Sequence, residues 1–172
     1  MPYQHDIDCP GIEGHPAPDF SLPLNLHADG TPSSEPLTLA SLKGDFRLLY
    51  CFQSWCPGCH SSGFPALTEI VQAFLDKPGR LSCAVIQTVF EGFEENSYEA
   101  LIQTRTRYPL AVPFAHDEGE GKPGHGSVIM RDYHNGGTPW FILIAPDGRV
   151  VFNDFRIQPQ GVIDAVNATR HT

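Results

Sequence analysis

Two cysteines, Cys56 and Cys59, stand three positions apart in the segment Trp-Cys-Pro-Gly-Cys at residues 55–59. The segment directly follows the apolar run 46–52, which is typical of a strand buried on both faces, and precedes a stretch with helical spacing. Two thiols at this spacing can close a small disulfide. At the first turn of a helix, the Cys56 sulfur would face unpaired N–H groups and the positive end of the helix dipole, and both favour the thiolate. Since the thiolate is the form that attacks disulfides, the segment predicts thiol redox chemistry.

Length, charge and hydropathy narrow the class of protein. The chain has 172 residues, enough for one domain with a real core. Its net charge is −9 with only 11 Lys and Arg, so nucleic acid is not an expected partner. No apolar stretch approaches the roughly 18 residues that a membrane span requires. Residues 1–6 lack a basic and an apolar region, so we expect no secretory signal and a cytoplasmic location, although a trimmed periplasmic form would look the same.

The other three cysteines are scattered along the chain, so the five cysteines do not predict a disulfide-stapled secreted scaffold. Cys51 and Cys83 lie inside expected strands and are interpreted as inert core residues. Cys9 lies in polar sequence and is interpreted as an exposed bystander, with a third redox thiol as the alternative.

The expected elements alternate between strands and helices, which predicts an α/β domain with a mixed sheet and helices on both faces. Residues 1–36 are rich in Pro and Gly and are expected to form an N-terminal extension packed on the core, with residues 37–172 as the domain. A glycine-rich loop is expected over 117–137, with at most a short element at 127–133. Strands are expected at 37–39, 46–52, 81–89 and 110–115, a hairpin at 140–144 and 149–155, an edge strand at 19–24, and helices at 57–76, 97–107 and 160–170.

Three motifs in a fixed order resemble the thioredoxin fold: the cysteine pair after a strand, Pro65 in the following helix, and Thr138-Pro139 just before the hairpin. The chain is more closely similar to the TlpA/ResA-type thiol-disulfide oxidoreductases of the redoxin (AhpC/TSA-related) group, which also open with a segment like residues 14–22. The resemblance covers roughly residues 14–168. It implies a thioredoxin-like three-layer α/β/α sandwich with a mixed central sheet, an N-terminal extension and a Gly-rich insertion.

The resemblance also implies roles for individual residues. Cys56 would attack, Cys59 would resolve the mixed disulfide, and a cis Pro139 would face them. An X-Pro bond can adopt the cis form at a cost of only about 0.5–1 kcal/mol, although an ordinary loop proline remains the simpler alternative. The expected substrate-binding positions are Trp55, Pro57, Gly58 and the backbone of Thr138.

The implied partners are a disulfide-containing protein or small-thiol substrate and an unidentified electron donor, with no cofactor or metal required. Four other functions compete with the proposed thiol-disulfide exchange. The Cys-x-x-Cys-His sequence ending at His60 also matches the c-type haem attachment motif, but no export signal accompanies it. A structural zinc site would need a second ligand pair. A peroxiredoxin-like thiol peroxidase would carry Pro where Leu49 stands, and a redox-inert thioredoxin-fold binding module would not need Cys59.

The chain departs from its relatives where they place a proton acceptor. Tyr50 occupies the position of the buried Asp of thioredoxins, and Ser62 occupies that of the Glu of ResA-like proteins, with Gly63 as an inserted residue. His60 could stabilise the Cys56 thiolate or shuttle protons, whereas helical spacing favours a solvent-facing residue, so its role stays open. Two further sets are expected to be loop residues without a catalytic or metal-binding role: Glu91, Glu94 and Glu95, and His116, His125 and His134.

Overall fold

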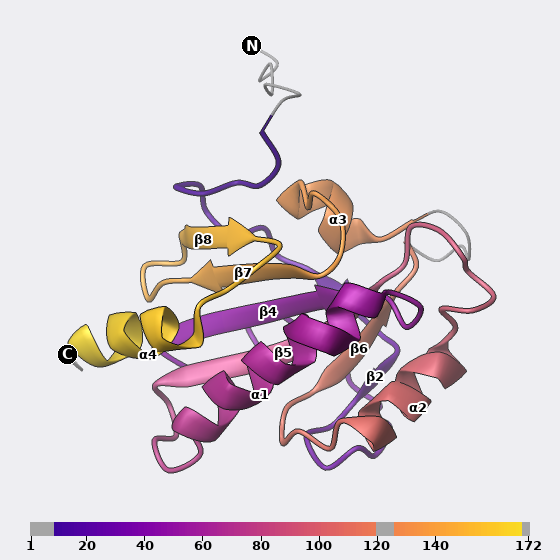
Figure 1. Cartoon of the computed structure of the whole chain (residues 1–172), viewed down its shortest axis with the longest axis horizontal. Coiled ribbons are helices and arrows are strands. Elements are labelled where there is room, and N and C mark those ends of the chain that lie inside the picture. Colours follow the sequence, from indigo (N-terminus) through magenta and orange to yellow (C-terminus); the bar gives the residue numbers. More distant parts are fainter. Residues whose placement is uncertain (1–8, 120–125, 170–172) are drawn as a thin grey trace.

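The structure of the protein is a computed structural model, which describes residues 9–119 and 126–169. At its centre lies a mixed six-stranded sheet (Figure 1) in the order β2-β6-β5-β4-β7-β8. The three middle strands β4, β5 and β6 run parallel, and β2, β7 and β8 run antiparallel to their neighbours. The strands are β2 (Asn25–Leu26), β4 (Phe46–Phe52), β5 (Leu81–Thr88), β6 (Phe114–Asp117), β7 (Trp140–Ile144) and β8 (Val150–Asp154).

Three α-helices cover one face of this sheet: α1 (Phe64–Ala73), α2 (Tyr98–Arg107) and α4 (Pro159–Ala168), with a short π-helix, η1 (Cys59–Gly63), leading into α1. Alternate residues of β4 project to this side, and Leu48, Tyr50 and Phe52 are completely buried there. They pack against the apolar faces of the helices, such as Leu67 of α1 and Leu101 of α2. This core supports the start of η1, where the cysteine pair lies.

The opposite face carries a different kind of layer. It is covered by α3 (Val128–Tyr133) and by the two-stranded sheet of β1 (Ser21–Leu22) and β3 (Leu37–Thr38). Two β4 side chains that point the other way, Leu49 and Cys51, are buried in this second core. The α/β fold with a mixed central sheet is therefore confirmed, although only one helix of the described residues, α3, lies on this face.

The N-terminal part of the chain contacts both edges of the central sheet. Asn25 of β2 pairs with Ala115 of β6 at one edge. At the other edge, the Gly14 N–H donates to the carbonyl of Val150 over 2.8 Å, and the Val150 N–H donates to the carbonyl of His15 over 2.9 Å. The segment is thus hydrogen bonded to the outermost strands of the sheet.

Most expected elements appear close to their predicted positions, and three differ. Within the edge strand expected over 19–24, only β1 forms, and it pairs with β3 in the small sheet, whereas β2 forms the edge of the central sheet. The strand expected at 110–115 is β6, which begins only at Phe114, because Pro109 and Pro113 bracket the intervening apolar residues and supply no N–H to a ladder. The helix expected over 57–76 consists of η1 and α1, with a wider turn over its first residues. Within the expected glycine-rich loop, residues 120–125 lie outside the described residues, and α3 forms near the predicted short element.

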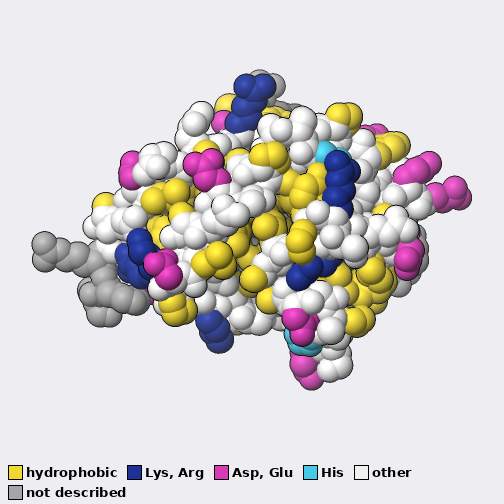
Figure 2. Space-filling model, turned by 60° about the horizontal axis from the view of Figure 1, so that its bottom comes forward, with side chains coloured by type: hydrophobic (Ala, Val, Ile, Leu, Met, Phe, Trp, Pro, Cys, Tyr) yellow, Lys and Arg dark blue, Asp and Glu magenta, His cyan; other side chains and the backbone are white. Residues whose placement is uncertain are grey.

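The surface over the helices is apolar in its middle. Figure 2 shows the side of the molecule that carries α1 and α2, where hydrophobic side chains gather in the middle and charged side chains lie around them. Leu75, just after α1, is 64% exposed. On the described part of this side, the basic groups form no continuous track of the kind that binds a phosphate backbone. Among the described residues, no helix has both the length and the apolar character to cross a bilayer.

Candidate active site at the Cys56–Cys59 pair

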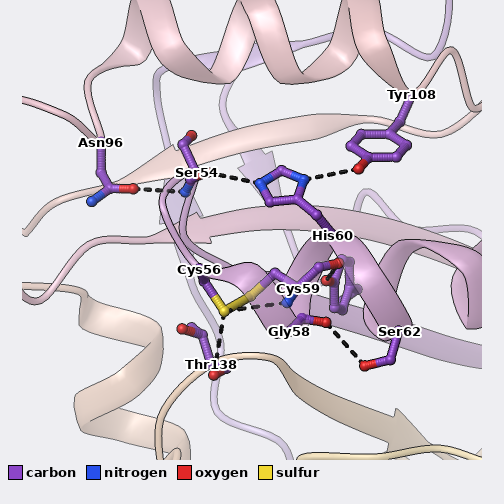
Figure 3. Close-up of a disulfide and its surroundings, with 10 residues drawn as sticks. Ser54, Cys56, Gly58, Cys59, His60, Ser62, Asn96, Tyr108 and Thr138 are labelled. Carbon is purple, nitrogen blue, oxygen red and sulfur yellow. Dashed lines mark hydrogen bonds between the residues drawn. A yellow bond between two sulfur atoms is a disulfide. The ribbon is translucent and has the colours of Figure 1, made fainter.

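The two cysteines form a disulfide at the start of the helical segment (Figure 3), with their Cα atoms 5.3 Å apart. Cys59 is completely buried and Cys56 is half-buried, so only the upstream sulfur faces the outside. The backbone N–H of Cys59 donates to the Cys56 Sγ over 3.2 Å. After reduction, the same N–H would stabilise negative charge on that sulfur.

The segment before β7 faces the disulfide. Strand β4 pairs with β7 so that Cys51 lies opposite Trp140, and the residues beyond each strand end therefore meet. The Cys56 Sγ lies 3.6 Å from the carbonyl oxygen of Thr138 (Figure 3), and the Thr138-Pro139 bond is cis. A Cβ added at Gly58 would stand 3.6 Å from the Pro139 ring. The structure thus brings together the residues expected to act on and to bind the substrate.

Trp55 provides an apolar surface beside the reactive sulfur. Its side chain is 47% exposed, and its ring packs so closely on Gly92 that a Cβ there would stand 2.8 Å away. Phe90, on the same loop as Gly92, is 38% exposed, and Pro57 is also exposed. The chain on either side of Cys56 is therefore flanked by apolar groups that a substrate polypeptide could contact.

Tyr50 lies directly beneath the disulfide, at the position where thioredoxins carry a buried Asp. The side chain is fully buried, and its hydroxyl donates to the Cys59 carbonyl over 2.8 Å. Burial raises the pKa of Tyr50 well above its usual value, with smaller contributions from Tyr108 and Cys51. Tyr50 is therefore a neutral hydrogen-bond donor at ordinary pH and cannot replace the carboxylate as a proton acceptor.

Gly63 explains how this phenol fits. The residue ends η1, in which the Phe64 N–H donates to the Cys59 carbonyl five residues back. A Cβ at Gly63 would overlap the Tyr50 hydroxyl and stand 2.8 Å from its Cζ. Gly63, the inserted residue, is thus accommodated in the π-helical turn η1, a geometry that often occurs at functional sites.

His60 is not solvent-facing, so that expectation is wrong. Its ring is half-buried between two partners (Figure 3): Nε2 lies 2.7 Å from the carbonyl oxygen of Ser54, and Nδ1 lies 2.8 Å from the Tyr108 hydroxyl. The ring also stacks near Phe64, with centroids 5.8 Å apart. The spacing rule assumed an ordinary α-helix, whereas His60 lies in the wider η1 turn.

A buried polar network lies behind Ser54, and sequence reasoning missed it. The Ser54 N–H donates to Asn96 Oδ1 over 2.6 Å, and its hydroxyl donates to the Gln87 side chain. Gln87 Nε2 in turn lies 2.9 Å from the Ser97 carbonyl and 2.9 Å from Nδ1 of His116. The parallel pairing of β4 and β5 sets Gln87 opposite Phe52, so Gln87 lies near Ser54 at the carboxyl ends of the two strands. This shared strand end is the signal in the sequence that could have linked Gln87 to Ser54.

A cleft of about 350 Å³ opens between the dithiol loop and α2. Trp55 and His60 border it on one side, and Glu95 and Arg107 supply opposite charges to its lining. The other lining residues are Ser54, Ala100, Gln103 and Thr104.

The other candidate residues are the remaining cysteines, the three glutamates and the histidines. Cys51 and Cys83 are buried, and burial raises the pKa of both thiols, that of Cys83 to about 12. Cys9 is exposed. The three glutamates 91, 94 and 95 are exposed loop residues, as expected. His116 was expected in a loop, and this expectation is wrong: His116 lies in β6 and is buried, and its Nε2 lies 3.3 Å from Glu118 Oε2.

Residues 9–119 and 126–169 contain no group of three His, Cys, Asp or Glu side chains placed to hold a metal ion. His125 lies outside the described residues.

A mixed sheet with a disulfide at the start of a helix and a cis proline opposite it defines a thioredoxin-like fold. Solved structures agree: a thioredoxin-like superfamily protein superimposes with a TM-score of 0.71 at 24% identity, covering 89% of this chain and 94% of that one. A thiol-disulfide isomerase from Corynebacterium glutamicum gives a TM-score of 0.66 at 20% identity, covering 94% and 96%.

The family follows from the sequence itself. The profile of the AhpC/TSA family matches residues 13–153, so the chain belongs to that family. No curated protein matches the chain. The chain is thus a thioredoxin-fold redoxin, and the family supports an oxidoreductase role in general terms.

Proposed function

We propose that this protein is a thiol-disulfide oxidoreductase in which Cys56 is the nucleophile and Cys59 the resolving thiol. The observation that carries the proposal is the asymmetry of the pair. Cys56 is half-buried and its sulfur accepts a hydrogen bond from the Cys59 N–H, while Cys59 is completely buried. A substrate can therefore reach only Cys56 first.

The reaction has two exchange steps. The Cys56 thiolate attacks one sulfur of a substrate disulfide, which forms a mixed disulfide and releases the other sulfur as a thiolate. The Cys59 thiol then loses its proton to solvent or to the released thiolate, and its sulfur attacks the Cys56 sulfur. The Cys56–Cys59 disulfide forms, and the substrate leaves with two thiols after proton uptake. An external dithiol donor returns the pair to the reduced form.

The geometry also supports a way to hold the substrate. The carbonyl of Thr138 lies 3.6 Å from the reactive sulfur, so this segment is placed to pair with the backbone beside a substrate cysteine. Trp55 and Phe90 supply exposed apolar surface nearby. These features favour a polypeptide disulfide as substrate, with small disulfides as the alternative.

Insulin reduction in the presence of dithiothreitol tests the proposal. We expect activity in the unmodified protein and none in Cys56→Ser. In Cys59→Ser that has been reduced and then freed of dithiothreitol, we expect a trapped mixed disulfide with the substrate. Cys83→Ser is the matched control, because that thiol is buried apart from the pair. If Cys59→Ser keeps full turnover, the dithiol mechanism is wrong and exchange needs Cys56 alone. If the unmodified protein shows no turnover, a redox-inert module or a peroxiredoxin-like thiol peroxidase replaces the proposal. Oxidation of Cys56 by hydrogen peroxide, timed against a free thiol, separates those two.

The reduction potential of the pair would then give its direction. A value near that of thioredoxin, about −270 mV, supports a cytoplasmic reductase, and a value near about −120 mV supports an oxidant in an exported form. Equilibration with glutathione, followed through Trp55 fluorescence, measures it.

A further inference from the structure

We infer that His60 is a positioning residue for the nucleophile: its Nε2–H holds the Ser54 carbonyl and thereby fixes the turn that carries Cys56. The inference rests on the proposed function, since it concerns the reactivity of the same sulfur. Three chain segments meet at this ring, namely the dithiol loop, η1 and the end of α2.

The hydrogen bonds determine which nitrogen carries the proton. The Ser54 carbonyl can only accept, so Nε2, at 2.7 Å, must donate. Nδ1 of the neutral ring is then an acceptor, and the Tyr108 hydroxyl donates to it over 2.8 Å. Both nitrogens have protein partners, and the ring is packed near Phe64 and Tyr108. His60 is therefore fixed in one tautomer and one orientation.

Ser54 is the residue through which this order reaches the nucleophile. Its N–H is bound by Asn96 and its hydroxyl by Gln87, so the His60 contact completes the set of its backbone hydrogen bonds. Two residues later, the Cys56 N–H donates to the carbonyl of Gln53 over 3.1 Å and closes the turn. A turn fixed at Ser54 keeps the Cys56 sulfur at 3.2 Å from the Cys59 N–H.

The consequence concerns the acidity of Cys56. A hydrogen bond to a thiolate is stronger than one to a thiol, so it lowers the thiol pKa, and this effect depends on distance and alignment. If the Ser54 carbonyl loses its donor, the turn loosens and the bond to the sulfur weakens on average. Losing most of one charge-assisted bond corresponds to a rise in the Cys56 pKa of about one unit, or about tenfold less thiolate at neutral pH.

Two amide variants separate the two nitrogens of the ring. His60→Gln places an N–H donor at the position of Nε2, and His60→Asn places an amide only near Nδ1 and leaves the Ser54 carbonyl unpaired. Tyr108→Phe is the matched control, because it removes the other hydrogen bond of His60 and keeps the one to Ser54.

The measurement is the rate of Cys56 alkylation by iodoacetamide against pH in the reduced full-length protein, followed on the Cys56 peptide by mass spectrometry. We expect His60→Asn to raise the Cys56 pKa by about one unit, and His60→Gln and Tyr108→Phe to shift it by less than about 0.3 unit. Urea unfolding is run alongside. A purely structural role would lower stability in both amide variants and leave their Cys56 pKa values alike.

Two results would overturn the inference. An unchanged Cys56 pKa in His60→Asn means that the Ser54 contact does not matter, and an equal shift in His60→Gln means that the imidazole itself, through its charge, is the cause. Both results are read from the alkylation of Cys56 and do not require a substrate. A failure of insulin reduction in the unmodified protein would instead count against the proposed function alone.

Discussion

Gly63→Ala tests whether the phenol of Tyr50 and the π-helical turn are one interlocked unit. The backbone of Gly63 has φ −66° and ψ −57°, which alanine adopts without strain. The substitution therefore changes sterics and little else. Its new methyl group would overlap the Tyr50 hydroxyl and stand 2.8 Å from Cζ.

The surroundings of Tyr50 leave the ring little room to move. Its centroid lies 4.8 Å from that of Phe141 and 5.0 Å from that of Phe64, and the side chain is completely buried. Overpacking of this kind costs about 1–3 kcal/mol. Displacing the hydroxyl from the Cys59 carbonyl adds about 1 kcal/mol. The higher helix propensity of alanine returns up to about 1 kcal/mol. We expect a net loss of about 2 kcal/mol of unfolding free energy.

A double-mutant cycle makes this estimate specific. Tyr50→Phe alone removes the hydrogen bond to the Cys59 carbonyl and costs about 1 kcal/mol. In the Gly63→Ala background, the same change also removes the worst overlap, so the double variant should be more stable than the sum of the singles by about 1 kcal/mol. Gly161→Ala is the control. Gly161 lies in α4, and the nearest atom to its new Cβ would be Gln158 Cβ at 3.7 Å, an ordinary van der Waals distance.

Urea titration of the oxidised protein followed by tryptophan fluorescence gives the four free energies. Gly161→Ala should be neutral or stabilising by up to about 1 kcal/mol. The reasoning is refuted if Gly63→Ala behaves like Gly161→Ala, or if the effects of Tyr50→Phe and Gly63→Ala simply add. Either result would mean that the turn and the phenol adjust independently.

Two further predictions concern the surroundings of the dithiol. Asn96→Ala, which leaves the Ser54 N–H without its buried acceptor at 2.6 Å, should lower the unfolding free energy by about 2–3 kcal/mol in urea titration; an unchanged midpoint would contradict the role given to this contact. In native protein at pH 7.5, iodoacetamide should label Cys9 and spare Cys51 and Cys83, because a raised pKa lowers the thiolate fraction, for Cys83 with a pKa of about 12 by roughly a thousandfold. Labelling of Cys83 as fast as Cys9 would show that β5 opens readily.

The sequence was sufficient for the parts of the fold that repeat a pattern. The continuous apolar run became β4 with the predicted ends, Phe46 and Phe52. The Pro-Asp-Gly turn predicted the hairpin of β7 and β8, and Ser97 begins α2 by accepting a hydrogen bond from the Ala100 N–H. These features depend on local propensity and on burial of one face, which a sequence pattern records.

The site was predictable only where it has a motif. Cys56 and Cys59 were found from their spacing, and they form the disulfide in the structure. Asn96 and Gln87 have no such signal, because their role depends on a sheet edge that joins distant segments. His60 was misplaced because a π-helical turn changes which way a side chain points, and Gly63 alone hinted at that turn.

The N-terminal segment has a consequence for how the chain folds. It is hydrogen bonded to the two outermost parts of the central sheet, with β2 beside β6 and the Ile12 N–H on the Asn153 side chain, 141 residues away. During synthesis this segment leaves the ribosome early, yet both of its partners are made late. Until the N-terminal segment has docked on β6 and β8, these two strands have unprotected edges that can pair with other chains. Completion of the sheet therefore depends on contacts of very high sequence separation, which form slowly, and aggregation during synthesis competes with that last docking step.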